Sequence, residues 1–162
     1  MQKIGIGYDV HKIEKDKQLT IGGINIPYEI NGTKYGVTAH SDGDVLTHAI
    51  IDALLGAMGL GDIGEHFPDT SSKYKNINSQ ILLKEVNNML QQQSYKIINI
   101  DATVIAQAPK ISPYKIQMRK TLATTLNIQI SQINIKATTE EGLGFTGQNQ
   151  GIAANAVCLI NN

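Results

Sequence analysis

The amino-acid sequence predicts one domain of the α/β (α+β) class, built on a mixed β-sheet. Three observations support this prediction. Apolar residues recur with the period of strands in some segments and of helices in others, and the two kinds of segment alternate along the chain. No repeat, low-complexity tract or linker divides the 162 residues. A chain of this length can bury a substantial core as a single unit, residues 1–162.

The elements follow from local patterns. Strands are predicted where aliphatic and β-branched residues lie between turn residues, at residues 3–10, 19–27 (two short strands around Gly22-Gly23), 96–107, 133–139 and 151–160. Helices are predicted where apolar residues recur at helical spacing, or where Ser-Pro marks a helix start, at residues 44–58, 78–93 and 112–127. Turn-rich sequence predicts loops at residues 28–43 and 59–76.

The amino-acid composition disfavours several classes of function. Basic and acidic residues balance at 14 each, so the excess of positive charge typical of nucleic-acid or membrane-surface binding is missing. The chain has no Trp and few aromatic residues, which disfavours base stacking. Cys158 is the only cysteine, so no intrachain disulfide forms, and a reducing compartment fits. No signal peptide or membrane span is predicted. We expect a cytoplasmic protein with neither nucleic-acid nor membrane partners.

A cluster of polar residues predicts a metal site. Asp9 and His11 are two positions apart on a predicted strand, so their side chains share one face. On the otherwise apolar helix 44–58, Asp44, His48 and Asp52 form one polar stripe. We predict that Asp9, His11 and His48 hold zinc or a similar divalent ion with one coordination position open, as in catalytic sites. Asp44 or Asp52 would orient His48. The alternative is that Asp9 and His11 are surface residues and His48 a hydrogen-bonded core histidine.

The segment AHSDGD, residues 39–44, is a second candidate. It lies at the start of a predicted helix, where Ser41 or Asp42 is predicted to cap free backbone N–H groups, and this capping is compatible with a role in a site. A helix N-terminus also attracts phosphate. No nucleophile-elbow motif supports a Ser-His-Asp hydrolase triad here.

Two strand ends carry the remaining candidates. Lys110 ends AQAPK, residues 106–110, as either a phosphate-binding charge or a solvated lysine. The segment ATTEEGLGFTG, residues 137–147, combines threonine hydroxyls with carboxylates, which suit a phosphate-bound cation, although a plain polar turn explains it as well. Neither a dinucleotide-binding glycine motif nor a P-loop occurs.

Together these segments resemble the 2-C-methyl-D-erythritol 2,4-cyclodiphosphate synthases of the non-mevalonate isoprenoid pathway. The motifs occur in family order over nearly the whole chain: IGIGYDVH, IGGINIP, AHSDGDVLTHAIIDALLGAMGLGDIGEHFPDT, IDATVIAQAPK and IKATTEEGLGFTG. The resemblance implies a subunit with helices packed on one face of the sheet. It also implies a homotrimer whose sheets face the three-fold axis and whose active sites lie between subunits.

The resemblance further implies the reaction. The substrate would be 4-diphosphocytidyl-2-C-methyl-D-erythritol 2-phosphate, whose 2-phosphate attacks the β-phosphorus and releases CMP and a cyclic diphosphate. Such a lyase reaction needs no protein nucleophile, because the enzyme only has to align two phosphates and neutralise their charge. Two other functions remain open. A metal-dependent phosphodiesterase or nucleotide hydrolase would use water as nucleophile, and a non-catalytic trimeric scaffold would bind metal or nucleotide without turnover.

Residue roles are implied by the same resemblance. Asp9, His11 and His48 match zinc ligands, and Glu141 matches the ligand of a second ion, Mg²⁺ or Mn²⁺. His40 and Thr139 match the residues that stabilise the transition state. The residues matching the substrate pocket, with the cytidine at 106–112, are Ser41, Asp62, Gly64, Phe67, Pro68, Asp69, Thr70, Ser71, Ala106, Gln107, Ala108, Pro109, Lys110, Ile111, Ser112, Thr138 and Phe145.

Three features depart from the family pattern. The loop before His40 is longer than in typical members, and Glu140 replaces the usual Thr or Asn. Gln148 stands where many members carry an arginine that is linked to isoprenoid diphosphates in the central cavity of the trimer. We therefore predict that this protein binds such diphosphates weakly or not at all.

Overall fold

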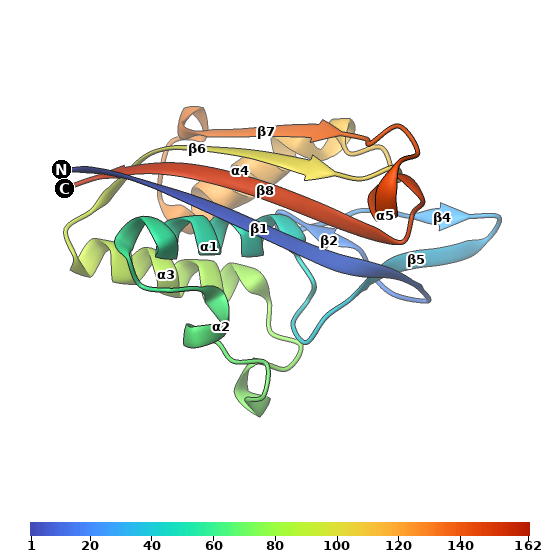
Figure 1. The fold of residues 1–162 in the computed structure, drawn as a ribbon, viewed down its shortest axis with the longest axis horizontal. Helices are drawn as coiled ribbons and strands as arrows, with labels where there is room; N and C mark the ends of the chain where they lie inside the picture. The colour runs from blue at the N-terminus through green and yellow to red at the C-terminus, as the bar shows by residue number, and fades with distance from the viewer.

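The computed structural model describes all of residues 1–162 and has a six-stranded mixed sheet at its centre (Figure 1). The strand order is β4-β5-β1-β8-β6-β7. Only β6 and β7 run parallel, and the other neighbouring strands are antiparallel. The strands are β1 (Gln2–Lys15), β4 (Glu29–Ile30), β5 (Thr33–Thr38), β6 (Lys96–Ile105), β7 (Ile133–Thr138) and β8 (Gly151–Asn161).

The predicted α/β class with a mixed sheet is confirmed. Helices α1 (Val45–Met58) and α4 (Lys115–Leu126) pack on the sheet, and α3 (Ser79–Gln92) packs on both of them. In Figure 1 the two chain ends lie together at one end of the sheet, where β1 pairs with β8. No helix is long and apolar enough to cross a bilayer. The hairpin predicted around Gly22-Gly23 is present as β2 (Thr20–Ile21) and β3 (Ile24–Asn25).

Helix α1 lies directly against the backbone of β1. A Cβ atom on Gly5 would stand 1.8 Å from the Ala53 carbonyl oxygen, and one on Gly7 would stand 2.0 Å from that of Ala49. Only glycine allows strand and helix to approach so closely. The helix is buried on nearly all sides. This contact brings the residues that follow Gly7 on β1 close to α1.

We expect Gly7→Ala to lower the free energy of unfolding by about 3 kcal/mol or more, because backbone atoms must move to admit the methyl group. The matched control is Gly56→Ala on α1, where the new Cβ has no neighbour closer than 3.9 Å. Because alanine has a higher helix propensity than glycine, Gly56→Ala should leave the free energy of unfolding unchanged or raise it by up to about 1 kcal/mol. Urea denaturation of both variants measures the difference, and equal effects would contradict the close contact.

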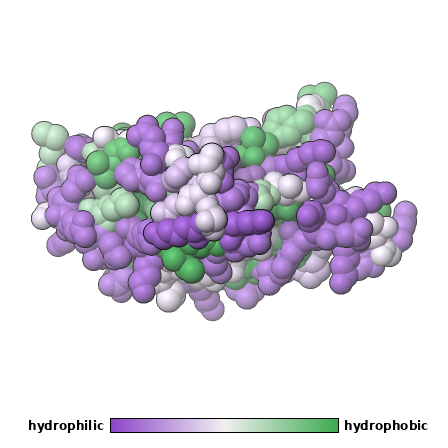
Figure 2. Space-filling view, turned by 90° about the horizontal axis from the view of Figure 1, so that it is seen from below, coloured by the Kyte–Doolittle hydropathy of each residue, from purple (hydrophilic) through white to green (hydrophobic).

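The sheet face turned away from the helices is apolar along β1. Ile4 and Ile6 are each 72% exposed, and Tyr8 and Val10 follow on the same face, with Val157 of β8 also exposed. In contrast, the surface in Figure 2, seen from the side where α2 (Ile63–His66) and α3 lie in Figure 1, is mostly hydrophilic. A row of large apolar side chains on one face is typical of a surface that is covered in an assembly.

The loop predictions were partly wrong. Residues 28–43 contain β4 and β5, because β1 continues past the predicted strand to Lys15 and pairs there with β5. Residues 59–76 contain α2 and a 3₁₀ turn (Ser72–Tyr74). The predicted helix 112–127 begins as a 3₁₀ turn (Ser112–Tyr114) before α4, and the predicted loop after β7 includes a short α5 (Gly144–Gly147). Strand pairing orders β4 and β5, and the Ile63 N–H at the start of α2 donates to Asp52 of α1 at 2.8 Å, so these tertiary contacts order residues whose local pattern is that of a turn.

Candidate active site

Asp9, His11 and His48 converge on one point between β1 and α1. The Asp9 Oδ2 atom stands 2.9 Å from His11 Nε2 and 2.9 Å from His48 Nδ1, and the two nitrogens are 3.2 Å apart. Ligand atoms around a tetrahedral zinc ion are roughly 3.3 Å from one another. The donor set of one carboxylate and two imidazoles therefore fits a divalent metal ion. The predicted grouping of these three residues is confirmed, and the alternative of separate surface and core residues is not.

The charge of the Asp9 carboxylate suits this role. Burial alone would raise the pKa of the Asp9 carboxyl, but hydrogen bonds and positive charge from the two histidines lower it to about 2. Burial by itself would lower the pKa of His48, which is 8% exposed, yet its hydrogen bond to Asp9 and the carboxylate charge raise that pKa. The Asp9 carboxylate is thus anionic throughout the physiological pH range, as an oxygen donor to a divalent ion must be.

The predicted partners of His48 were wrong. The Asp44 carboxylate accepts hydrogen bonds from Gly22 N at 2.7 Å and Gly23 N at 2.6 Å, and it also caps α1. Asp52 accepts one from Ile63 N at 2.8 Å. Both acids are occupied by backbone N–H groups of loops that fold back onto α1, so neither orients the histidine.

Two serines meet the other ring nitrogen of His48. Its Nε2 atom stands 2.8 Å from Ser79 Oγ and 3.1 Å from Ser41 Oγ. Ser79 is the first residue of α3, and its hydroxyl and backbone N–H both donate to Asp42. The contacts of Ser79 and Asp42 were not predicted, because no spacing in the sequence links α3 to a histidine on α1.

The segment around His40 lies beside the loop after α2. His40 Nε2 is 3.2 Å from the Ser71 carbonyl oxygen, and Asp62 caps α2 by accepting from Glu65 N at 3.0 Å. Phe67 is buried with its ring edge toward Tyr74. The structure thus brings the predicted residues at 40–41 and 62–71 to one side of Asp9, His11 and His48, the proposed metal-binding cluster. The predicted capping of α1 by Ser41 or Asp42 is wrong, because Asp44 is the residue that accepts from Thr47 N. Ser41 and Asp42 accept from Gly43 N and Asp44 N before the helix, and Asp42 also accepts the Ser79 N–H at the start of α3.

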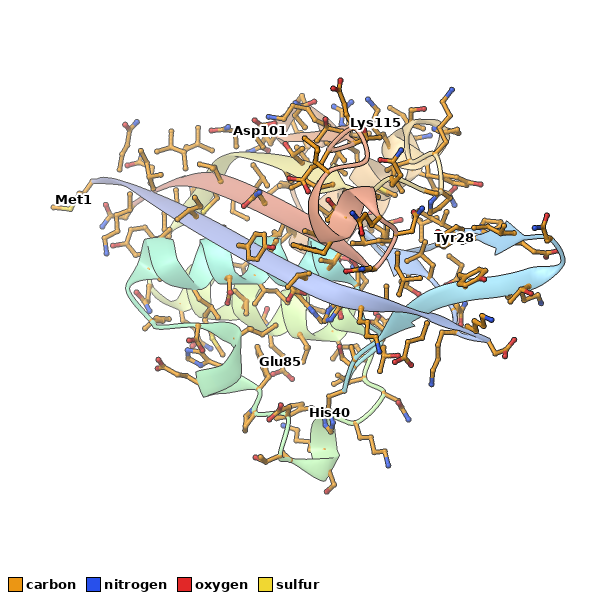
Figure 3. All side chains as sticks on the ribbon, turned by 45° about the vertical axis from the view of Figure 1, so that its right-hand side comes forward. Met1, Tyr28, His40, Glu85, Asp101 and Lys115 are labelled. Atoms are coloured by element: carbon orange, nitrogen blue, oxygen red, sulfur yellow. The ribbon has the colours of Figure 1, made fainter.

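A separate cavity of about 260 Å³ lies where β6 and β7 end. None of the metal-binding cluster lines it. In Figure 3 His40 lies at the opposite end of the molecule from Lys115, which follows the cavity segment 106–112 in the chain. The lining residues are Ala106, Gln107, Pro109, Lys110, Ile111, Ser112, Ala137, Thr138 and Thr139.

The loop after β7 is a turn held by its own hydrogen bonds. Thr139 Oγ1 accepts from Glu141 N at 3.3 Å, and the Glu140 carboxylate accepts from the hydroxyl of Thr146. The Glu140 side chain is therefore turned toward buried Thr146, whereas the exposed Glu141 carboxylate has no partner within the chain. Phe145 lies away from the 260 Å³ cavity, in a hollow that includes Val10 and His11.

Comparison with known proteins gives one consistent family. The YgbB family model matches residues 2–161. The 2-C-methyl-D-erythritol 2,4-cyclodiphosphate synthase of Clostridium novyi is 59% identical, with 98% of each chain covered, and that of Francisella tularensis subsp. novicida is 57% identical, with 98% of this chain and 97% of the relative covered.

Solved structures of similar proteins indicate the same family. The Plasmodium falciparum IspF in complex with CDP is 41% identical, with a TM-score of 0.83, and the match covers 98% of this chain and 95% of that one. The bifunctional IspDF of Campylobacter jejuni is 42% identical, with a TM-score of 0.92 over 99% of this chain, but this chain spans only 42% of that protein. From the match over nearly its full length, the chain belongs to the YgbB family, in which its similar relatives are cyclodiphosphate synthases.

Proposed function

We propose that the chain catalyses the cyclodiphosphate synthase reaction of its relatives, in isoprenoid precursor biosynthesis, as one catalytic domain of residues 1–162. An oxygen of the substrate 2-phosphate attacks the β-phosphorus of the cytidine diphosphate group. The bond from this phosphorus to the bridging oxygen breaks, and the oxygen leaves with CMP. The observation that carries the proposal is the cluster of Asp9, His11 and His48, built into a chain 59% identical to a synthase.

The chain's own residues supply binding and charge. Asp9, His11 and His48 would hold zinc or a similar divalent ion, and the unpaired carboxylate of Glu141 would hold Mg²⁺ or Mn²⁺ with the substrate diphosphate. Such ions, when bound, neutralise phosphate charge and polarise phosphoryl oxygens. His40 and Thr139 would stabilise the charge of the transition state, and Lys110 the charge that grows on CMP.

The substrate pocket would combine the residues beside the metal-binding cluster with those of the 260 Å³ cavity. Ser41 and the loop after α2 would hold the methylerythritol and sugar-phosphate ends, and the cavity at the end of β6 would hold cytidine. The proposed residues are Ser41, Asp62, Gly64, Phe67, Pro68, Asp69, Thr70, Ser71, Ala106, Gln107, Ala108, Pro109, Lys110, Ile111, Ser112, Thr138 and Phe145.

We further propose a homotrimer whose sheets face the three-fold axis. The exposed apolar row on β1 supports it, because contiguous exposed apolar side chains mark surfaces that bind another subunit. The separation of the 260 Å³ cavity from the metal-binding cluster also supports it, since two neighbouring subunits would together complete one site. A cytoplasmic location is proposed with it, because the single buried cysteine fits a reducing compartment.

The direct test is a CMP-release assay on 4-diphosphocytidyl-2-C-methyl-D-erythritol 2-phosphate, with and without chelator. Phosphorus NMR should detect a cyclic diphosphate that forms together with CMP and is lost on chelation. A linear phosphate product would indicate a hydrolase that uses water. Bound metal and nucleotide without any product would indicate a scaffold.

The residue at 148 predicts a difference in ligand binding. Calorimetry with farnesyl diphosphate should give weak or no binding, because the Gln148 amide carries no charge and cannot form the paired hydrogen bonds that an arginine makes with phosphate. Gln148→Arg should raise the affinity. Tight binding by the unchanged protein would contradict this prediction.

A further inference from the structure

We propose that Ser79 and Asp42 are positioning residues that hold His48 with its Nδ1 lone pair directed at the metal ion. The inference rests on the metal site of the proposed function, but it concerns residues that do not themselves bind metal or substrate. It assigns a specific task to two side chains from outside α1, and both stand on the far side of the His48 ring from Asp9.

The three groups form a continuous chain of contacts. His48 Nε2 is 2.8 Å from Ser79 Oγ, the Ser79 hydroxyl donates to Asp42 Oδ1, and the Ser79 N–H donates to Asp42 Oδ2 at 2.9 Å. Ser79 is completely buried, so water does not compete for its hydroxyl. This series of contacts connects three segments of the protein: α1, the loop before it and the start of α3.

The chemistry of these groups fixes the direction in which each hydrogen bond of this series is donated. An ionised carboxylate only accepts hydrogen bonds, so the hydroxyl proton of Ser79 points to Asp42. A lone pair of Ser79 Oγ then faces His48 Nε2, which therefore carries the ring proton. Ser41 Oγ lies farther from the same nitrogen, at 3.1 Å, and Ser79 is the nearer acceptor at 2.8 Å. In the neutral imidazole the Nδ1 atom is left as the acceptor, and this atom faces Asp9 and His11. A hydrogen bond from the second ring nitrogen is what orients a metal-binding histidine.

Ser79 is not needed to cap its own helix. The cap of α3 is Asn78, whose side-chain oxygen accepts from Gln80 N at 2.8 Å. The hydroxyl of Ser79 is therefore free for its contacts with His48 and Asp42. Asn78 caps α3 and Ser79 contacts His48, so variants at these two adjacent positions test the two roles separately.

The first test compares zinc affinities by competition with a chromogenic chelator. We expect Ser79→Ala to raise the zinc Kd by about 10- to 100-fold, the usual effect of removing the group that orients a metal-binding histidine. Asn78→Ala removes the helix cap instead and should lower Tm while leaving the zinc Kd unchanged. Circular dichroism checks that both variants fold.

Asp42→Asn tests the direction of the chain. An amide has one acceptor oxygen in place of two, while Ser79 N and Oγ and Asp44 N all donate to Asp42. In one orientation the amide NH₂ meets the Ser79 N–H, and that contact is broken. In the other orientation it meets the Ser79 hydroxyl, which turns its proton toward His48 Nε2. This favours the tautomer with a proton on Nδ1, which cannot bind metal. We expect the zinc Kd to rise at least as much as in Ser79→Ala. The slowly exchanging Nε2 proton that NMR should detect at His48 in the zinc-loaded protein should also disappear.

The proposal is overturned if Ser79→Ala and Asp42→Asn bind zinc as tightly as the unchanged protein. It is also overturned if Asn78→Ala weakens zinc as much as Ser79→Ala, because the effect would then come from helix stability. These measurements do not depend on turnover. A failure of the unchanged protein to release CMP would therefore reject the proposed function alone, and unchanged zinc affinity in an active Ser79→Ala variant would reject this inference alone.

Discussion

We expect His48→Ala to remove zinc binding and CMP release together. The variant loses one of three protein ligands and leaves the partly buried Asp9 carboxylate with a single histidine partner. A metal ion that stabilises transition-state charge by several kcal/mol accounts for a loss of activity of roughly 10³-fold or more. Metal analysis of the purified protein and the CMP-release assay measure the two effects. Asp9→Asn should give a smaller decrease in both, because the amide keeps an oxygen but not its charge.

Val10→Ile is the control for these variants. Val10 lies between Asp9 and His11 in the chain, but its side chain is on the opposite face of β1. It should keep full zinc content, and its added methyl group should mainly disturb packing on the exposed face of β1. If His48→Ala keeps normal zinc content, the ion binds elsewhere, and the assignment of the cluster is wrong.

The grouping of Asp9, His11 and His48 could be predicted because they lie on regular elements. Strand periodicity placed Asp9 and His11 on one face, and a polar stripe on an apolar helix indicated His48. The partners of these residues could not be predicted in the same way. Asp44 and Asp52 share the stripe, but loops distant in the sequence donate backbone N–H groups to them, at Gly22 and Ile63. Ser79 approaches from a helix 31 residues away, and no local pattern encodes that approach.

The orientation of β1 has a similar explanation. Its isoleucines alternate with glycines, and hydrophobicity alone would direct Ile4 and Ile6 into the core. The structure instead turns Gly5 and Gly7 inward, because α1 approaches too closely for any side chain there. The polar pair at positions 9 and 11 is then inward as well. The strands β4 and β5 were missed because their residues are turn-like and become strands only through pairing, β5 with the end of β1 and β4 with β5.

We expect Ile6→Asp to dissociate the proposed trimer. Ile6 is 72% exposed in the single chain and lies in the middle of the apolar row on β1. An unpaired carboxylate buried between subunits would cost several kcal/mol, because it loses its hydration without gaining a partner. Size-exclusion chromatography with light scattering should give a monomer mass in place of a trimer mass. Ile81→Asp is the matched control, since Ile81 is 51% exposed on α3, away from the sheet, and should remain a trimer.

The same variant separates metal binding from catalysis. All three residues of the metal-binding cluster belong to one chain, so monomeric Ile6→Asp should still bind zinc. The cavity at the end of β6 is not lined by that cluster, so a monomer would lack a complete active site and should release no CMP. A zinc-loaded but inactive monomer would therefore support an active site shared between subunits. An active monomer would contradict it, because both ends of the substrate would then have to be held by a single chain.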